Sequence, residues 1–137
     1  MKHGVLLFAH GARDSRWALP FEDIAERLRA RAPQAVVELA FLEFMTPTLV
    51  AGGQRLIDAG CGHVDVVPLF LGAGGHVRRD IPDLLAQLEA ANPAVRFELR
   101  PAIGEMDSVI EAMAVAALSW LPADEAPAPS PFGRGLG

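Results

Sequence analysis

Short unbroken apolar runs alternate along the chain with longer segments in which apolar residues recur every three or four positions. The runs predict strands over residues 5–9, 35–42, 64–71 and 95–99, because a strand buried on both faces is apolar throughout. The helical periodicity predicts a helix after each run. The apolar positions of these helices are Trp17, Phe21, Ile24, Ala25 and Leu28, then Leu49, Val50, Leu56 and Ile57, then Leu84, Leu85 and Leu88, and finally Met106, Val109, Ile110, Met113, Ala117 and Leu118.

Three local features qualify this pattern. Thr46-Pro47 is typical of a helix N-cap followed by proline at the first helical position, and it places the start of the second helix there. Gly52 and Gly53 weaken that helix by about 1 kcal/mol each unless close packing requires them. Pro68 removes a ladder donor from the third strand. We therefore expect a bulge there, or a strand that stops pairing on one side.

Four β–α units with short connections predict a parallel sheet with right-handed crossovers. The expected architecture is a flavodoxin-like three-layer α/β domain with strand order 2-1-3-4 and helices on both faces. This domain spans residues 1–121. Residues 122–137 hold four prolines and three glycines in 16 positions and show no apolar periodicity, which predicts a disordered tail.

Composition narrows the possible classes of protein. No apolar run approaches the roughly 20 residues that cross a bilayer. The net charge of −5 disfavours a nucleic-acid partner, and the single cysteine excludes an internal disulfide framework and a cysteine zinc site. We expect a soluble cytoplasmic protein without a nucleic-acid or membrane partner.

The four histidines fall into two pairs at opposite ends of the same two strands. His10 and His76 follow the carboxyl ends of the first and third strands, whereas His3 and His63 lie at or before the amino ends. Ligands of such sheets bind beyond the carboxyl ends, at the switch point between these strands. Glu43, at the end of the second strand, lies at the same carboxyl-end edge of the sheet, called the rim below. Two imidazoles and a carboxylate suit iron, cobalt, nickel or zinc.

Other readings of these residues remain open. A single histidine in a loop usually hydrogen-bonds backbone, and a rim glutamate can simply face solvent or cap a turn. Arginines flank the two histidines and form a basic collar suited to a polyanionic ligand, although each could be an ordinary solvated charge. They are Arg13, Arg16, Arg78 and Arg79. The glycine-rich residues 72–75 lack the pattern of a nucleotide-binding P-loop.

Three segments resemble the CbiX family of class II tetrapyrrole chelatases: FAHGARD (residues 8–14), FLEFMTPTL (41–49) and PLFLGAGGHVRRDIP (68–82). The resemblance covers residues 3–121. It implies a chelatase-like fold, a homodimer, and insertion of Co²⁺ or Fe²⁺ into sirohydrochlorin for cobalamin or siroheme biosynthesis, with Ni²⁺ used by close relatives. It assigns metal binding to His10 and His76 and places Glu43 near the site. The metal is then a substrate, and no tightly bound cofactor is expected.

The residues suit that chemistry. Two neutral imidazoles hold a divalent ion loosely enough to pass it on, unlike a closed four-ligand site. One histidine or Glu43 could accept the pyrrole protons, the arginine collar could pair with substrate carboxylates, and the apolar macrocycle could lie against Met45 or Phe44.

Three alternatives to a chelatase stay open. A metal or tetrapyrrole carrier would use the same site without turnover. A histidine phosphatase is disfavoured because Ala9 precedes the His-Gly pair where such enzymes carry arginine. A flavodoxin-like domain with an unrelated ligand would leave the placement of the histidines unexplained.

Overall fold

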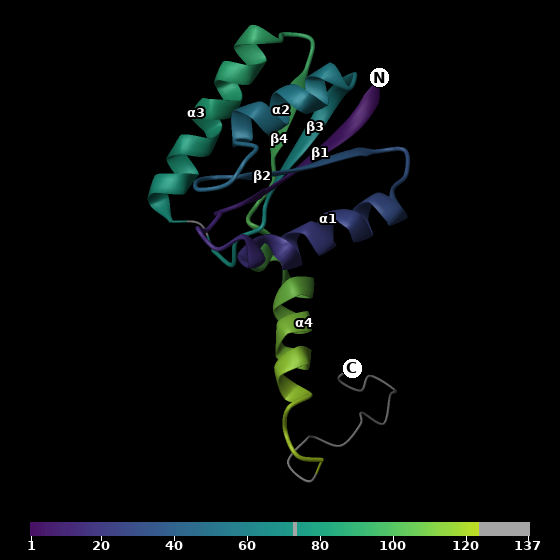
Figure 1. Cartoon of the computed structure of the whole chain (residues 1–137), viewed down its shortest axis with the longest axis vertical. Coiled ribbons are helices and arrows are strands. Elements are labelled where there is room, and N and C mark those ends of the chain that lie inside the picture. The colour runs from purple at the N-terminus through teal and green to yellow at the C-terminus, as the bar shows by residue number, and fades with distance from the viewer. Residues whose placement is uncertain (73, 124–137) are drawn as a thin grey trace.

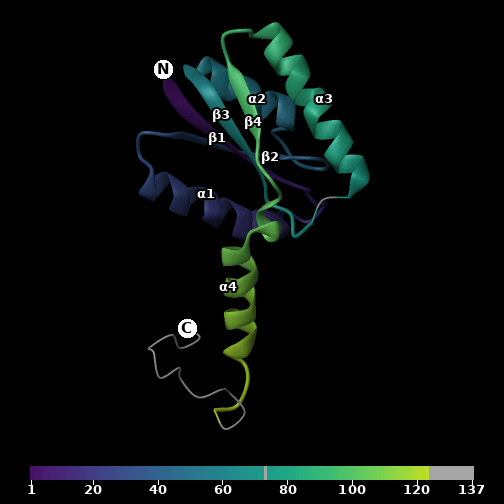
Figure 2. The ribbon, with the colours of Figure 1, turned by 180° about the vertical axis from the view of Figure 1, so that it is seen from behind.

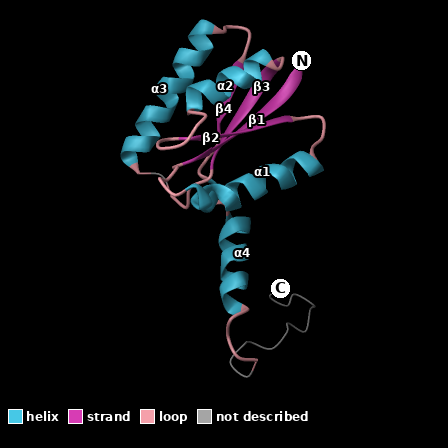
Figure 3. Cartoon of the chain, in the orientation of Figure 1, coloured by secondary structure: helices cyan, strands magenta, loops and turns pink. Residues whose placement is uncertain are grey.

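The computed structural model describes residues 1–72 and 74–123, apart from the side chains of residues 75–78. The predicted tail therefore lies outside the described residues from position 124 onward. Four strands alternate with four α-helices, and two short 3₁₀ helices, η1 (Ser15–Ala18) and η2 (Ile103–Glu105), precede α1 and α4 (Figure 3). The elements are β1 (Lys2–Ala9), α1 (Leu19–Arg31), β2 (Val36–Phe41), α2 (Leu49–Asp58), β3 (Cys61–Pro68), α3 (Gly75–Ala91), β4 (Arg96–Leu99) and α4 (Asp107–Leu118).

The strands form one parallel sheet in the order β2-β1-β3-β4, which confirms the predicted topology. Helix α1 covers one face, and α2 and α3 cover the other (Figure 1). Successive side chains of β1 point to opposite faces of the sheet, as in any strand. Leu6 and Phe8 join the core with α2 and α3, whereas Leu7 and Ala9 pack on the α1 side.

The two glycines of α2 lie against the sheet and α3. A Cβ added at Gly52 would stand 3.0 Å from Leu6 Cδ1, and one added at Gly53 would stand 2.7 Å from Leu88 Cδ1. Close packing therefore explains why the helix keeps two weak helix formers, as the sequence suggested.

The predicted start of α2 was wrong by two residues. Thr48 is the N-cap, its hydroxyl accepting from the Ala51 N–H at 3.2 Å, and the helix begins at Leu49. The Thr46–Pro47 peptide bond is cis and precedes the helix. Pro47 therefore belongs to the connection and not to the first helical turn.

The third strand begins and ends three residues earlier than predicted. Within β3, pairing with β4 stops at Val66, whereas pairing with β1 continues to Pro68. Leu69 N–H donates to the Phe8 carbonyl at 2.7 Å, and Arg100 N–H to the Val66 carbonyl at 2.9 Å. Because neighbouring residues alternate direction, the missing Pro68 N–H faces the side where β4 has ended. Of the two outcomes expected from Pro68, the structure therefore shows a strand that stops pairing on one side.

Helix α4 departs from the expected layering. It projects from the end of the sheet and packs mainly against η2 (Figures 1 and 2), and none of its residues is buried. The helices on the two faces are therefore α1 on one side and α2 and α3 on the other. Within the described residues, no helix is both long and apolar enough to cross a membrane.

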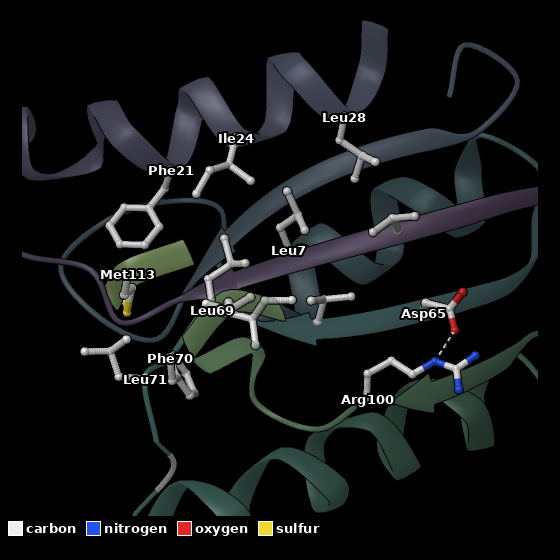
Figure 4. A pocket seen from close by; sticks show the side chains of 14 residues that line it. Leu7, Phe21, Ile24, Leu28, Asp65, Leu69, Phe70, Leu71, Arg100 and Met113 are labelled. Atoms are coloured by element: carbon white, nitrogen blue, oxygen red, sulfur yellow. Dashed lines mark hydrogen bonds and ion pairs between the residues drawn. The ribbon is translucent and has the colours of Figure 1, made fainter. Parts of the chain in front are cut away.

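The position of α4 leaves a groove beside α1. This apolar groove measures about 800 Å³ and runs along the sheet face between α1 and the start of α4 (Figure 4). Its walls include Leu7 of β1, Leu69 just after β3 and Phe21 of α1, with Met113 of α4 at one end. The α1 face of the sheet is therefore only partly covered.

Candidate functional site: the carboxyl-end rim

His10 and Glu43 lie on adjacent connections at the carboxyl ends of β1 and β2. The Glu43 N–H donates to the His10 carbonyl at 3.0 Å, directly after the Leu42 N–H donates to the Ala9 carbonyl at 2.9 Å. The ladder between the strands thus continues into the loops. Gly11 has a φ of +92°, and a Cβ there would overlap the Glu43 carbonyl. Glycine at position 11 permits this close approach of the two loops.

A buried aromatic ring supports His10. The imidazole lies 4.3 Å from the Phe70 ring, centroid to centroid, with the planes tilted by 31°. Phe70 is 3% exposed, whereas His10 is an exposed residue. The core therefore limits the orientation of the ring from one side, and solvent or a ligand can reach it from another. An imidazole in this position can bind a divalent metal.

Phe44 presents an aromatic ring at the same rim. Its φ is +65°, uncommon for a bulky residue, and the Met45 N–H closes a tight turn by donating to the Glu43 carbonyl at 2.8 Å. The residue is 56% exposed, and the Arg13 guanidinium carbon lies 4.7 Å from the centroid of its ring. A strained backbone that holds an aromatic side chain outward is typical of a binding site.

Met45 takes a different position from Phe44. It is half-buried and, like Trp17 and Phe21, packs against the core between the sheet and α1. Of the two residues that the sequence offered as a platform for a macrocycle, Phe44 is the one that the fold exposes at the rim.

The four arginines of the proposed collar are not equivalent. Arg16 is bound to Asp14, Nη2 to Oδ2, at 2.8 Å; this pairing lowers the pKa of Asp14 and raises that of Arg16. Arg13 is exposed and, in the described part of the chain, has no carboxylate partner. Arg79 is exposed near the start of α3. Arg13 is therefore more available to an anionic ligand than Arg16.

His76 and Arg78 lie in the first turn of α3, after the connection from β3. Their side chains lie outside the described residues, so the metal-binding and substrate-binding roles predicted for them stay predictions. The backbone nevertheless places His76 beyond the carboxyl end of β3, the strand adjacent to β1.

The described geometry defines a class of protein. It is a doubly wound α/β domain whose central strands end at an open rim that carries an imidazole, a carboxylate, an exposed aromatic ring and an arginine. The chain belongs to the CbiX family, whose model matches residues 4–117.

Curated relatives carry chelatase names. The chain is 30% identical over 113 residues to the sirohydrochlorin ferrochelatase of Bacillus subtilis, a match that covers 82% of this chain and 43% of that protein. It is 31% identical over 109 residues to the sirohydrochlorin cobaltochelatase of Sulfurisphaera tokodaii, covering 80% of this chain and 86% of that protein.

Two solved structures share the fold. A putative cobalamin biosynthesis CbiX protein from Marinobacter aquaeolei matches with a TM-score of 0.74 and 33% identity, over 85% of this chain and 95% of that one. The sirohydrochlorin chelatase SirB from Bacillus subtilis subspecies spizizenii, in complex with cobalt, matches with a TM-score of 0.74 and 28% identity, over 87% of this chain and 50% of that one. The chain thus spans about half the length of some of its relatives.

Proposed function

We propose that this protein inserts a divalent metal, Co²⁺ or Fe²⁺, into sirohydrochlorin. The observation that carries the proposal is the shared rim, where the Glu43 N–H donates to the His10 carbonyl and holds a histidine and a glutamate on adjacent connections. Membership of the CbiX family and relatives named for this reaction support it. The product belongs to cobalamin biosynthesis with cobalt and to siroheme biosynthesis with iron.

The reaction exchanges one metal ion for two protons on the macrocycle. In our proposal His10 and His76 hold the incoming ion through neutral imidazole nitrogens. Few protein ligands leave positions open for the pyrrole nitrogens. Glu43, an exposed carboxylate at the same rim, accepts protons that leave those nitrogens. Phe70 acts as a positioning residue because its ring contacts the imidazole.

The macrocycle has an apolar face and anionic edges, and the rim offers a group for each. We assign the face to Phe44, which is exposed, and one edge carboxylate to Arg13 above it. A guanidinium can bind a carboxylate in bidentate fashion. We extend this role to Arg78 and Arg79 at the start of α3 for further carboxylates, while Arg16, engaged by Asp14, contributes less than Arg13.

We also propose that the working unit is a homodimer. Helix α4 exposes Ile110 and Met113 by 52% and 50%, and the apolar groove beside α1 lies open. A second copy whose α4 enters this groove would cover both surfaces. The coverage of only half of the SirB chain is consistent with two copies replacing a protein of twice the length.

Light scattering tests the dimer. We expect twice the mass of one chain, and Ile110→Asp should shift the protein toward monomer because it places a charge in the buried contact. Glu111→Gln, an exposed change on the same helix, is the matched control and should keep the dimer. A monomeric native protein, or an Ile110→Asp protein that remains a full dimer, would contradict the proposed surface.

The activity test is a visible-absorbance assay with catalytic amounts of protein, sirohydrochlorin and Co²⁺, repeated anaerobically with Fe²⁺ and Ni²⁺. Product in excess of the protein concentration, formed faster than the spontaneous reaction, supports a chelatase and ranks the metals. Preference for Ni²⁺ would make it a nickel chelatase. Tight binding of one equivalent without turnover would support a carrier and overturn the proposed reaction.

A further inference from the structure

A second group of ligating side chains lies at the opposite end of β1 and β3 from His10. His3 and His63 are register partners on these adjacent strands, and Asp65 follows His63 by two positions. Residues two apart in a strand share a face of the sheet. All three therefore stand on the face that α2 and α3 do not cover. Along seven residues of strand, they are roughly 20 Å from the carboxyl-end rim.

The donor atoms of this group converge. The two imidazole rings stack with centroids 4.8 Å apart and planes 20° from parallel. Asp65 Oδ2 lies 2.6 Å from His3 Nε2, and Asp65 Oδ1 lies 3.8 Å from His63 Nε2. One ligand atom from each residue can be chosen so that all lie within 4.8 Å of one another. Side-chain rotation of modest size would place them around one ion.

His63 carries the most informative atom. Its Nε2 is buried although the side chain as a whole is 37% exposed, and among the described residues it has no hydrogen-bond partner. A buried ring nitrogen without a partner is costly. The carboxylates of Asp65 and Glu98 stand 3.8 and 3.7 Å away, beyond hydrogen-bonding distance. A cation bound between His63 and Asp65 would give this nitrogen a partner.

Arg100 supplies an outer layer of contacts. Its Nε donates to Asp65 Oδ1 at 2.8 Å, and its Nη1 pairs with Glu98 Oε2 at 2.6 Å. Carboxylates that bind metals are commonly oriented by such hydrogen bonds. With neutral imidazoles, two carboxylates and one guanidinium leave the group with one negative charge. The arginine thus fixes Asp65 without making the site repel a cation.

We propose that His3, His63 and Asp65 form a second divalent-cation site, separate from the carboxyl-end rim. Two imidazole nitrogens and one carboxylate oxygen favour a borderline ion such as Co²⁺, Ni²⁺ or Zn²⁺ over Mg²⁺ or Ca²⁺. The bound ion would join β1 to β3 at the point where their register shifts, between Lys2 and His3. The proposal concerns binding alone and does not depend on the chelatase reaction.

An ion-pair network is the competing explanation. Arg100, Asp65 and Glu98 would form it without any metal, and His3 would join through Asp65. That network accounts for the orientation of Asp65. It leaves His63 Nε2 without a hydrogen bond, and it predicts that Co²⁺ has no affinity for this end of the sheet.

The experiment can isolate this site, because the sequence contains only four histidines. In an untagged His10→Ala/His76→Ala protein, His3 and His63 are the sole imidazoles. We expect Co²⁺, titrated alone by calorimetry, to bind this protein with one equivalent and to raise its Tm, since a ligand of the folded state stabilises it. Adding His63→Gln or Asp65→Asn should weaken binding at least about tenfold and abolish the rise in Tm.

Glu111→Gln, an exposed change on α4, is the matched control and should leave Co²⁺ binding as it was. Circular dichroism verifies that each variant is folded. If the double-alanine protein does not fold, the native protein and His63→Gln are compared instead, and the expected stoichiometry falls by one. The proposal is overturned if Co²⁺ does not bind the double-alanine protein in its folded state, or if the His63→Gln change leaves affinity and stoichiometry unaltered in either background.

Discussion

The two ends of β1 and β3 carry the same kind of side chain in opposite settings. At the carboxyl end, His10 stands exposed on a glycine-containing loop, at the rim where Arg13 lies over the exposed Phe44 ring. At the amino end, His3 and His63 are held in strand register and face carboxylates. An exposed loop with an arginine at the same rim that is free of carboxylate contacts, among the described residues, can admit and release an anionic ligand. A rigid pair of strands with negative neighbours is better suited to retaining a cation.

The largest effect on the free energy of unfolding should come from disturbing the connection after β1, at the carboxyl-end rim. Gly11→Ala forces a Cβ onto the Glu43 carbonyl at a φ of +92°. We expect a loss of about 1–3 kcal/mol in the free energy of unfolding, measured by urea denaturation, and at least a tenfold loss of chelatase rate. Gly72→Ala is the control in the neighbouring connection, where an added Cβ meets nothing within 4 Å. Equal losses in the two variants would show that the contact between the loops has no special role.

A smaller effect, on the KM for sirohydrochlorin, should distinguish Arg13 from Arg16 at this rim. Arg13→Ala should raise KM for sirohydrochlorin about three- to tenfold, which corresponds to roughly 1 kcal/mol of lost binding. Arg16→Ala should change KM less, because Asp14 already occupies that guanidinium. Steady-state kinetics of the two variants gives the comparison. A larger KM for Arg16→Ala than for Arg13→Ala would reverse our assignment of the anion-binding side chain.

The smallest effect is the change with pH in the free energy of unfolding that Asp65 causes at the amino ends of β1 and β3. Burial raises the pKa of Asp65, but the hydrogen bonds from His3 and Arg100 outweigh burial and leave that pKa below its ordinary value. Ionised Asp65 therefore stabilises the fold above the unfolded pKa of about 4, and this contribution is lost as the pH falls through the lower, folded pKa.

Metal-free native protein and Asp65→Asn, unfolded in urea between pH 2 and 7, test this sign. The native protein should be more stable by about 1 kcal/mol or less near pH 6, and the difference should vanish at the acid end. A difference that grows as the pH falls would mean that the carboxylate is not stabilised by its partners.

The sequence predicted the sheet order because alternating apolar runs and helical segments indicate a parallel topology, and this topology also places His10 and Glu43 at the carboxyl-end rim. It placed both ends of β3 three residues too late, because the apolar run continues into the connection after Pro68. It misplaced the start of α2, since Thr46-Pro47 and Thr48 offer the same capping chemistry and only the path of the chain decides between them. It could not predict the displaced α4, because the apolar residues of this helix show the same periodicity whether or not they pack on the sheet.

The sequence did not predict the cluster of His3, His63 and Asp65, for another reason. His63 and Asp65 share a strand face by simple alternation, but their approach to His3 depends on the register between β1 and β3. Register comes from pairing that one sequence does not display. The supporting contact of Phe70 with His10 likewise needs the fold, because 60 positions separate the two residues.

The difference between the two ends is tested most directly by comparing the chelatase rates of His10→Ala and His63→Gln with that of the native protein, in one assay with sirohydrochlorin and Co²⁺. We predict that His10→Ala lowers the rate at least about 100-fold, whereas His63→Gln lowers it less than about threefold. A His10→Ala protein that keeps its full rate, or a His63→Gln protein that loses as much as His10→Ala, would contradict the assignment of the chemistry to the carboxyl-end rim.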